Sequence, residues 1–151
     1  MALGLLLPLA ACSTTAIESQ TKTQDTRQAR VYFLRSTVTI GGVADIKVDG
    51  QKVASLANNS FFFVDRDPGQ YTISVENPFE TGRFSIPVAL RWSSIYYVEV
   101  SQRPEFLIVN AAFGIVGGAI EQANAPDNSG RFKLTLMDQN AGATMLQRLK
   151  Q

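Results

Sequence analysis

The chain has 151 residues, of which 45% are hydrophobic and 18% are charged, a composition typical of one globular domain with a single core. The formal net charge is +1 and the basic residues are scattered from Lys22 to Lys150, so nucleic acid is not expected as a partner. There is no histidine and only one cysteine, which argues against an internal disulfide, a tetrahedral metal site and a His-based general acid or base.

The first seventeen residues carry no charged side chain, which sets them apart from the rest of the chain. Residues 3–9, LGLLLPL, form an apolar run that is too short to cross a bilayer, since a spanning helix needs about 20 residues. The run has the length of the hydrophobic region of a secretory signal, and two small residues, Ala10 and Ala11, follow it. No Lys or Arg precedes the run, so we expect the true start of the protein to lie upstream.

The single cysteine comes directly after these small residues. The motif Leu9-Ala10-Ala11-Cys12 resembles the lipobox of bacterial lipoproteins. The resemblance implies a lipoprotein signal peptide over residues 1–11, cleavage before Cys12, and a membrane anchor formed by diacylglycerol and further acyl chains such as palmitate on that cysteine. The alternative is a buried free thiol in an N-terminal helix, which is a common environment for unpaired cysteines.

Residues 13–28 are rich in Ser, Thr and Gln and contain almost no large apolar side chain. Because such a segment cannot bury enough surface to offset the entropy lost on ordering, residues 12–28 are predicted to be the lipidated cysteine and a flexible tether. In the lipoprotein family a serine after the cysteine goes with export to the outer membrane, and Ser13 has that position. The resemblance therefore implies a bacterial envelope protein that is lipid-anchored in the outer membrane and faces the periplasm.

From Arg30 onward apolar and polar residues alternate with a period of two. Asp49-Gly50 predicts a tight hairpin turn because both residues tolerate positive φ, and Asp67-Pro68-Gly69 predicts a second turn. Pro87 lacks an N–H and therefore marks an edge strand or a bulge. Strands are expected in residues 30–36, 44–56 with its turn, 59–65, 70–76, 83–90, 95–100 and 131–138.

Short strands at regular spacing predict a mainly all-β fold over residues 29–151, taken as a single domain. The architecture expected is an antiparallel β-sandwich or a partly closed barrel of seven to eight strands. Near the end of the chain, Met145, Leu146 and Leu149 have helical spacing and predict a short C-terminal helix.

Residues 46–75 resemble PEGA-type domains and a related bacterial lipoprotein family of unknown function. The residues that carry the resemblance are Val48-Asp49-Gly50, the aromatic run Phe61 to Phe63 with Asp65 after it, and Pro68-Gly69-Gln70-Tyr71. The resemblance extends more loosely over residues 30–102 and departs from the pattern at Asn58-Asn59, where a glycine is more usual. It implies a small β-sandwich module outside the cytoplasm with no known reaction.

Residues 106–126 are the least typical of a β domain, because they are almost uncharged and rich in small side chains. Gly114 and Gly118 have the small-xxx-small spacing that lets helices approach closely. Three interpretations of this segment stay open: a small-residue helix over residues 109–123 that packs on the sheet, a segment that docks a partner or oligomerises, and a segment that dips into the bilayer. Phe113, Gly114 and Gly118 are its candidate contact residues.

Aromatic side chains are the other candidate binding groups. In the run Phe61-Phe62-Phe63 the middle ring faces away from the other two, either as a binding platform or because the strand is covered on both sides. Trp92 and Tyr97 are candidates for gripping a sugar, and Trp92 also for a membrane interface, with a position over the core as the alternative.

Catalysis is not expected. Asp65 and Asp67 are interpreted as turn-capping and solvated carboxylates, and no serine lies in a G-x-S-x-G setting. The sequence therefore predicts a non-enzymatic, lipid-anchored envelope protein without metal or cofactor, which acts as a protein-interaction or assembly module through residues 106–123. The alternative is a module that binds envelope glycan through Phe62, Trp92 or Tyr97.

Overall fold

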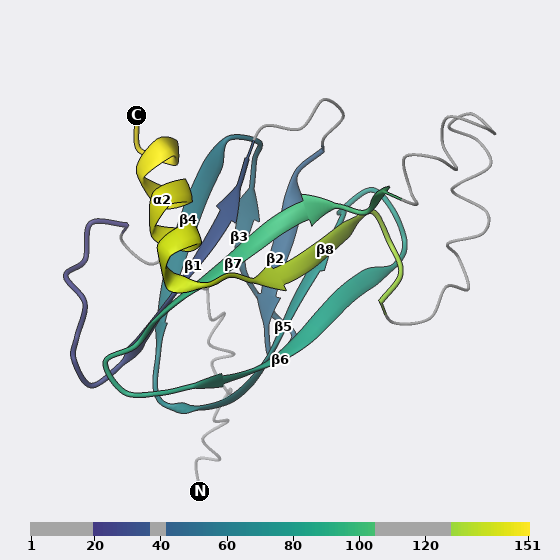
Figure 1. The fold of residues 1–151 in the computed structure, drawn as a ribbon. Coiled ribbons are helices and arrows are strands. Elements are labelled where there is room, and N and C mark those ends of the chain that lie inside the picture. The colour runs from purple at the N-terminus through teal and green to yellow at the C-terminus, as the bar shows by residue number, and fades with distance from the viewer. Residues whose placement is uncertain (1–19, 37–41, 105–127) are drawn as a thin grey trace, which may run out of the picture.

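The computed structural model describes residues 20–36, 42–104 and 128–151 of the chain, drawn in colour in Figure 1. The described residues form eight strands and one helix: β1 (Ala29–Arg35), β2 (Ala44–Val48), β3 (Gln51–Leu56), β4 (Ser60–Arg66), β5 (Gly69–Glu76), β6 (Arg83–Leu90), β7 (Ile95–Gln102), β8 (Phe132–Leu136) and α2 (Gln139–Leu149). The mainly-β fold class and the short C-terminal helix predicted from the sequence are confirmed.

The strands make two four-stranded sheets that pack face to face (Figure 1). The β1 sheet has the strand order β4-β1-β7-β8, and the β2 sheet has the order β3-β2-β5-β6. Apolar side chains from both inner faces form the main core, among them Val31 and Phe33 of β1, Ile46 of β2 and Val75 of β5. Of the two architectures expected, the described strands therefore form the β-sandwich.

One strand pair departs from the expected antiparallel arrangement. β1 pairs antiparallel with β4 but parallel with β7, with Arg30 opposite Ile95 and Phe33 opposite Val98. Between β1 and β7 the chain passes twice into the β2 sheet, first through β2 and β3 and then through β5 and β6. These excursions serve as the crossover connection that parallel strands require, so no helix is needed between them. The two central strands of the β1 sheet consequently start at the same end of the sandwich.

The predicted turns follow from residues that accept left-handed backbone. Asp49 and Gly50 have φ values of 49° and 79° and join β2 to β3 as the expected hairpin. Asn59, where the related sequence pattern more often has glycine, has a φ of 52°, a conformation that asparagine tolerates better than most residues. Pro87 is exposed in β6, which is an edge strand of the β2 sheet, as its missing N–H predicts.

The β1 sheet is covered on both faces. α2 packs on its outer face, where Leu34, Tyr97 and Leu146 form the centre of a second apolar cluster. Phe62 points into the main core between the sheets, whereas Phe61 belongs to the second cluster on the outer face. The aromatic run therefore reflects a strand buried on both sides rather than a binding platform.

Residues 20–28, here called the N-terminal strap, lie against the domain. The side-chain amide of Gln20 pairs with both backbone groups of Phe63 in the edge strand β4: Nε2 donates to the carbonyl oxygen at 3.2 Å, and Oε1 accepts from the N–H at 2.8 Å. Nη2 of Arg30 also donates to the carbonyl oxygen of Lys22, at 2.8 Å. In Figure 1 the strap is the purple segment that leads into β1.

The strap differs from the flexible tether expected over residues 12–28. The expectation rested on the small apolar surface of this segment, but polar side chains and backbone groups hold it through hydrogen bonds. The predicted signal peptide at 1–11, Cys12 and residues 13–19 lie outside the described residues. The same is true of the helix expected over 109–123.

Among the helices of the described residues, none combines the length and the apolar character needed to cross a membrane.

Candidate functional site

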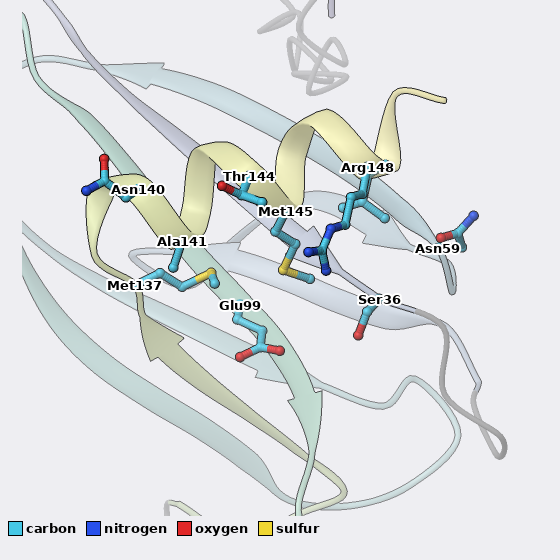
Figure 2. A pocket seen from close by; sticks show the side chains of 10 residues that line it. Ser36, Asn59, Glu99, Met137, Asn140, Ala141, Thr144, Met145 and Arg148 are labelled. Carbon is cyan, nitrogen blue, oxygen red and sulfur yellow. The ribbon is translucent and has the colours of Figure 1, made fainter.

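A groove of about 750 Å³ runs along α2 on the outer face of the β1 sheet (Figure 2). Its volume falls within the range of about 300–1,000 Å³ that is usual for ligand pockets. Its lining comes from α2, from the middle of β7 and from residues next to β1, β4 and β8: Ser36, Asn59, Glu99, Met137, Asn140, Ala141, Thr144, Met145, Arg148 and Leu149.

The N-cap and one glycine fix the position of α2, and with it one wall of the groove. Oδ1 of Asp138 accepts hydrogen bonds from the backbone N–H groups of Asn140 at 3.0 Å and Ala141 at 2.9 Å, so the helix begins at a capped end. Gly142 faces the ring of Tyr97 so closely that a Cβ on the glycine would lie 2.2 Å from Cγ of the tyrosine. The helix can rest on β7 because position 142 has no side chain.

The groove combines adaptable apolar side chains with one charge of each sign. Figure 2 shows Met137 and Met145 on the same side of α2, with Arg148 extending from α2 and Glu99 lying on β7. Methionine is unbranched and polarizable, so it can adapt to ligands of different shape. The groove can therefore accept apolar side chains that are flanked by charged or polar groups.

The outer face of the β1 sheet also carries an aromatic row across three strands. The rings of Phe63 and Tyr32 lie 5.4 Å apart between centroids, and the rings of Tyr32 and Tyr97 stack at 5.6 Å with 14° between their planes. The guanidinium carbon of Arg30 lies 3.8 Å from the centroid of the Phe63 ring, a cation–π distance. This row is a structural feature, because Phe63 and Tyr97 are buried.

Asp65 is neither a turn cap nor a solvated carboxylate, in contrast to the interpretation drawn from the sequence. It is buried and accepts two hydrogen bonds from Arg30, at 2.7 Å from Nε and 2.8 Å from Nη2, while Nζ of Lys22 lies 3.4 Å away. Burial by itself raises the pKa of Asp65, but the hydrogen bonds and charges of Arg30 and Lys22 outweigh burial and lower it. Asp65 is therefore an ionised structural group.

The three aromatic residues proposed for glycan binding lie in three different environments. Phe62 is 8% exposed within the main core, and Tyr97 is 7% exposed beneath α2, so neither ring is available at the surface. Trp92 is 66% exposed in the turn between β6 and β7 and lines a second pocket, at the other end of β1 from the groove. The structure thus keeps only Trp92 as a surface aromatic group from this set.

The remaining predicted site residues cannot be placed. Cys12, Phe113, Gly114 and Gly118 lie outside the described residues, as does the segment 106–123 that was expected to dock a partner. Within residues 20–36, 42–104 and 128–151, no group of three or more Asp, Glu, Cys or His side chains is arranged to hold a metal ion.

Sequence reasoning missed most of the groove. Met145 and Leu149 were recognised for their helical spacing. Glu99 on β7, Met137 after β8 and Arg148 on α2 carry no local signal of their own. The docking of α2 was readable only in part, because a glycine in the middle of a helix pattern can indicate close packing.

Comparison with known proteins gives one family. The model of a family described as a protein of unknown function, DUF2846, matches residues 25–112. No curated protein matches the chain. The matched range contains all residues that line the pocket at Trp92, whereas α2 and its wall of the groove follow it in the chain.

Proposed function

We propose, from the premise that this chain belongs to the DUF2846 family of proteins of unknown function, that it is a lipid-anchored protein of the bacterial envelope that acts as a protein-interaction module. Its role is non-enzymatic: it holds a partner protein rather than converting a substrate. The PEGA-like pattern at Val48-Asp49-Gly50 and Pro68-Gly69, read from the sequence, supports an extracytoplasmic binding module.

The support for the anchor is the lipobox-like motif that ends at Cys12, behind an apolar run of the length found in secretory signals. Ser13 supports export to the outer membrane, with the domain facing the periplasm. The membrane contact in this proposal is made by the lipid on Cys12.

The groove along α2 is the observation that carries the interaction function. Its apolar lining of Met137, Met145 and Leu149 packs against the second apolar cluster but is partly exposed, and the two methionines can adapt to a partner's side chains. Glu99 and Arg148 offer charges of opposite sign, which favour one orientation of a bound segment over its reverse. A short amphipathic segment of another protein fits this combination.

The state of Asp65 supports a non-catalytic role. Asp65 is one of the two carboxylates that the sequence analysis weighed, and Arg30 already occupies both of its oxygens. A carboxylate held ionised and buried in this way is poorly placed to exchange protons with a substrate.

Site-specific photo-crosslinking in cells that make the protein tests the interaction. A photoreactive amino acid at exposed Thr144, in the groove, should give one adduct of defined mass with a second protein, identified by mass spectrometry. The same group at exposed Gln70, on β5 in the other sheet, should not give that adduct.

A variant with a new charge in the groove, and a control variant with the same change outside it, test whether the adduct depends on the groove. Met145→Asp should remove the Thr144 adduct, because a buried carboxylate in an apolar contact is costly. Phe79→Asp, at an exposed apolar residue outside the groove, should keep it. Equal adducts from Thr144 and Gln70, or an adduct that survives Met145→Asp, would contradict the proposal.

A further inference from the structure

Three segments that are distant in sequence meet at the end of the sandwich where β1 begins. The strap contributes Asp25, Arg27 and Gln28, the turn between β4 and β5 contributes Asp67 and Pro68, and the turn between β6 and β7 contributes Trp92. Together they line a pocket of about 460 Å³, which is within the usual range of about 300–1,000 Å³ for small-ligand sites. The pocket is separate from the groove along α2 and does not depend on the function proposed for it.

Trp92 is an exposed ring on a backbone that is held in place. Its carbonyl oxygen accepts a hydrogen bond from Oγ of Ser94 at 3.1 Å, and the carbonyl oxygen of Ser94 accepts from the N–H of Arg30 at 2.9 Å and from Nε2 of Gln24 at 3.4 Å. Tryptophan is usually well covered in folded proteins, so a 66% exposed ring on a fixed turn is unusual. It therefore offers a flat apolar surface that is preorganised for binding.

The polar groups of the pocket are planar side chains with defined partners. Nε and Nη2 of Arg27 donate to the two carboxylate oxygens of Asp25, at 3.2 Å and 2.9 Å. These hydrogen bonds lower the pKa of Asp25 to about 2, so the pair is charged at neutral pH. Nε2 of Gln28 donates to Oδ1 of Asp67 at 3.2 Å, and the hydroxyl of Tyr71 donates to the carbonyl oxygen of Asp67 at 2.9 Å.

The charges in the pocket select among ligand classes. Two carboxylates and one guanidinium leave a net negative charge, which disfavours anionic ligands. Arg27 neutralises Asp25 and disfavours a simple cation, so the pocket is not built as a cation site. Hydroxyl groups both donate and accept hydrogen bonds, and they match a lining that presents acceptors on Asp67 and donors on Arg27 and Gln28.

We infer that this pocket binds a neutral saccharide, with one sugar ring stacked on Trp92 and its hydroxyl groups hydrogen-bonded to Asp67 and Gln28. The C–H face of a sugar is apolar and weakly positive, and it suits the negative face of an aromatic ring. The hydroxyl groups at the ring edge are then directed to the planar polar side chains that surround the indole.

The strap completes this site, because half of the lining residues belong to it. Its hydrogen bonds between Gln20 and the backbone of Phe63, and from Gln24 to the carbonyl oxygen of Ser94, hold it in the position that forms the pocket. Saccharide binding and docking of the strap should therefore strengthen each other.

Fluorescence titration tests the inference directly, because Trp92 is the only tryptophan in the chain. The full chain, kept in a detergent without sugar headgroups, is titrated with three neutral sugars: maltotriose, cellotriose and fully N-acetylated chitotriose. At least one should shift the emission with a Kd of about 1 mM or tighter, in the range of small polar ligands. Trigalacturonate should bind at least about tenfold more weakly than that sugar, because the pocket is negative.

Variants locate the binding. Asp67→Ala should weaken it about tenfold, the loss expected for hydrogen bonds to a charged group, and Gln20→Ala should weaken it several-fold by loosening the strap. Trp92→Ala, followed by calorimetry, should abolish it, whereas Phe79→Ala, which removes another exposed aromatic ring that is 85% accessible, should leave it unchanged.

Three results would overturn the inference: no emission shift with any of the three neutral sugars, an affinity that Asp67→Ala leaves unchanged, or tighter binding of trilysine than of every sugar. The last result would identify the site as one for a cationic peptide. None of them bears on the groove, whose crosslink from Thr144 should persist in Trp92→Ala.

Discussion

At Gly142 the absence of a side chain decides how closely α2 approaches the β1 sheet. In an exposed helix, Gly→Ala usually stabilises by about 1 kcal/mol because alanine is the better helix former. Here the new Cβ would lie 2.2 Å from Cγ and 2.4 Å from Cβ of the buried Tyr97, and overpacking of this kind costs about 1–3 kcal/mol. We expect Gly142→Ala to lower the free energy of unfolding, measured by urea denaturation.

Thr144→Ala is the control for this substitution, because Thr144 is on the exposed side of the same helix. It should be neutral or slightly stabilising, as helix propensity predicts. A stabilising Gly142→Ala would mean that α2 can move away from Tyr97 at little cost.

Asp65 gives the protein a pH-dependent contribution to stability. Its pKa is lower in the folded state than in the unfolded chain, so the contribution is present above the unfolded pKa of about 4 and is lost as the pH falls through the folded value. Asp65→Asn should lower the free energy of unfolding at pH 7 by about 3 kcal/mol, because it leaves Arg30 buried without its carboxylate. Below pH 4 the difference from the unsubstituted chain should shrink.

Denaturation curves from pH 2 to pH 7 measure this effect. Asp67→Asn provides the control, since Asp67 is a nearby carboxylate that is exposed. It should change the acid limb of the stability profile only slightly. An Asp65→Asn variant with the same acid limb as the unsubstituted chain would show that the ion pair with Arg30 contributes no pH dependence.

Among the elements, α2 depends on its N-cap. Asp138→Ala removes the acceptor for the N–H groups of Asn140 and Ala141 and should cost about 1 kcal/mol of stability, measured by urea denaturation. Asp138→Asn should cost little, because asparagine caps equally well. A full loss with asparagine would show that the charge near the helix dipole, rather than the hydrogen bonds, is what matters.

The strap acts on the edge of β4 through Gln20. The N–H of Phe63 points away from β1 and donates to Oε1 of Gln20. Gln20→Ala removes this acceptor, so the N–H of Phe63 should be exposed to solvent more often. A net loss of about 0.5–1.5 kcal/mol for one hydrogen bond corresponds to amide exchange about 2- to 10-fold faster at Phe63, measured by NMR. Exchange at Phe62, whose N–H points toward β1, should not change; equal acceleration at both would indicate general destabilisation.

For the whole molecule, the proposed anchor gives a prediction about membrane partition. One acyl chain gives only marginal binding, whereas two or more hold a protein firmly. Cys12→Ser should abolish palmitate labelling and leave the signal uncut by the lipoprotein peptidase. Palmitate label that persists in Cys12→Ser would contradict a lipid on this cysteine.

The strands and turns could be predicted from the sequence because each depends on residues that are neighbours along the chain. Alternation identified the strands, Asp49-Gly50 identified the hairpin, and Pro87 identified an edge. The strap was not predictable in the same way, since Gln20 and Phe63 meet only in the folded chain. The groove was missed for the same reason. Of the pocket only Trp92 was recognised as a candidate, because its other lining residues come from separate segments.

The parallel pairing of β1 with β7 also sets the order in which the sandwich can form. In the β2 sheet, β2 and β3 are joined by a two-residue turn and β5 is followed directly by its partner β6, so these pairs close short loops. In contrast, β1 pairs with β7 across a long loop, because Arg30 lies opposite Ile95, which is 65 residues further along the chain. Closing so long a loop costs more entropy and slows folding. Until β7 has formed, one edge of β1 has no strand beside it, so β1, the first of the described strands, is among the last to be fully paired.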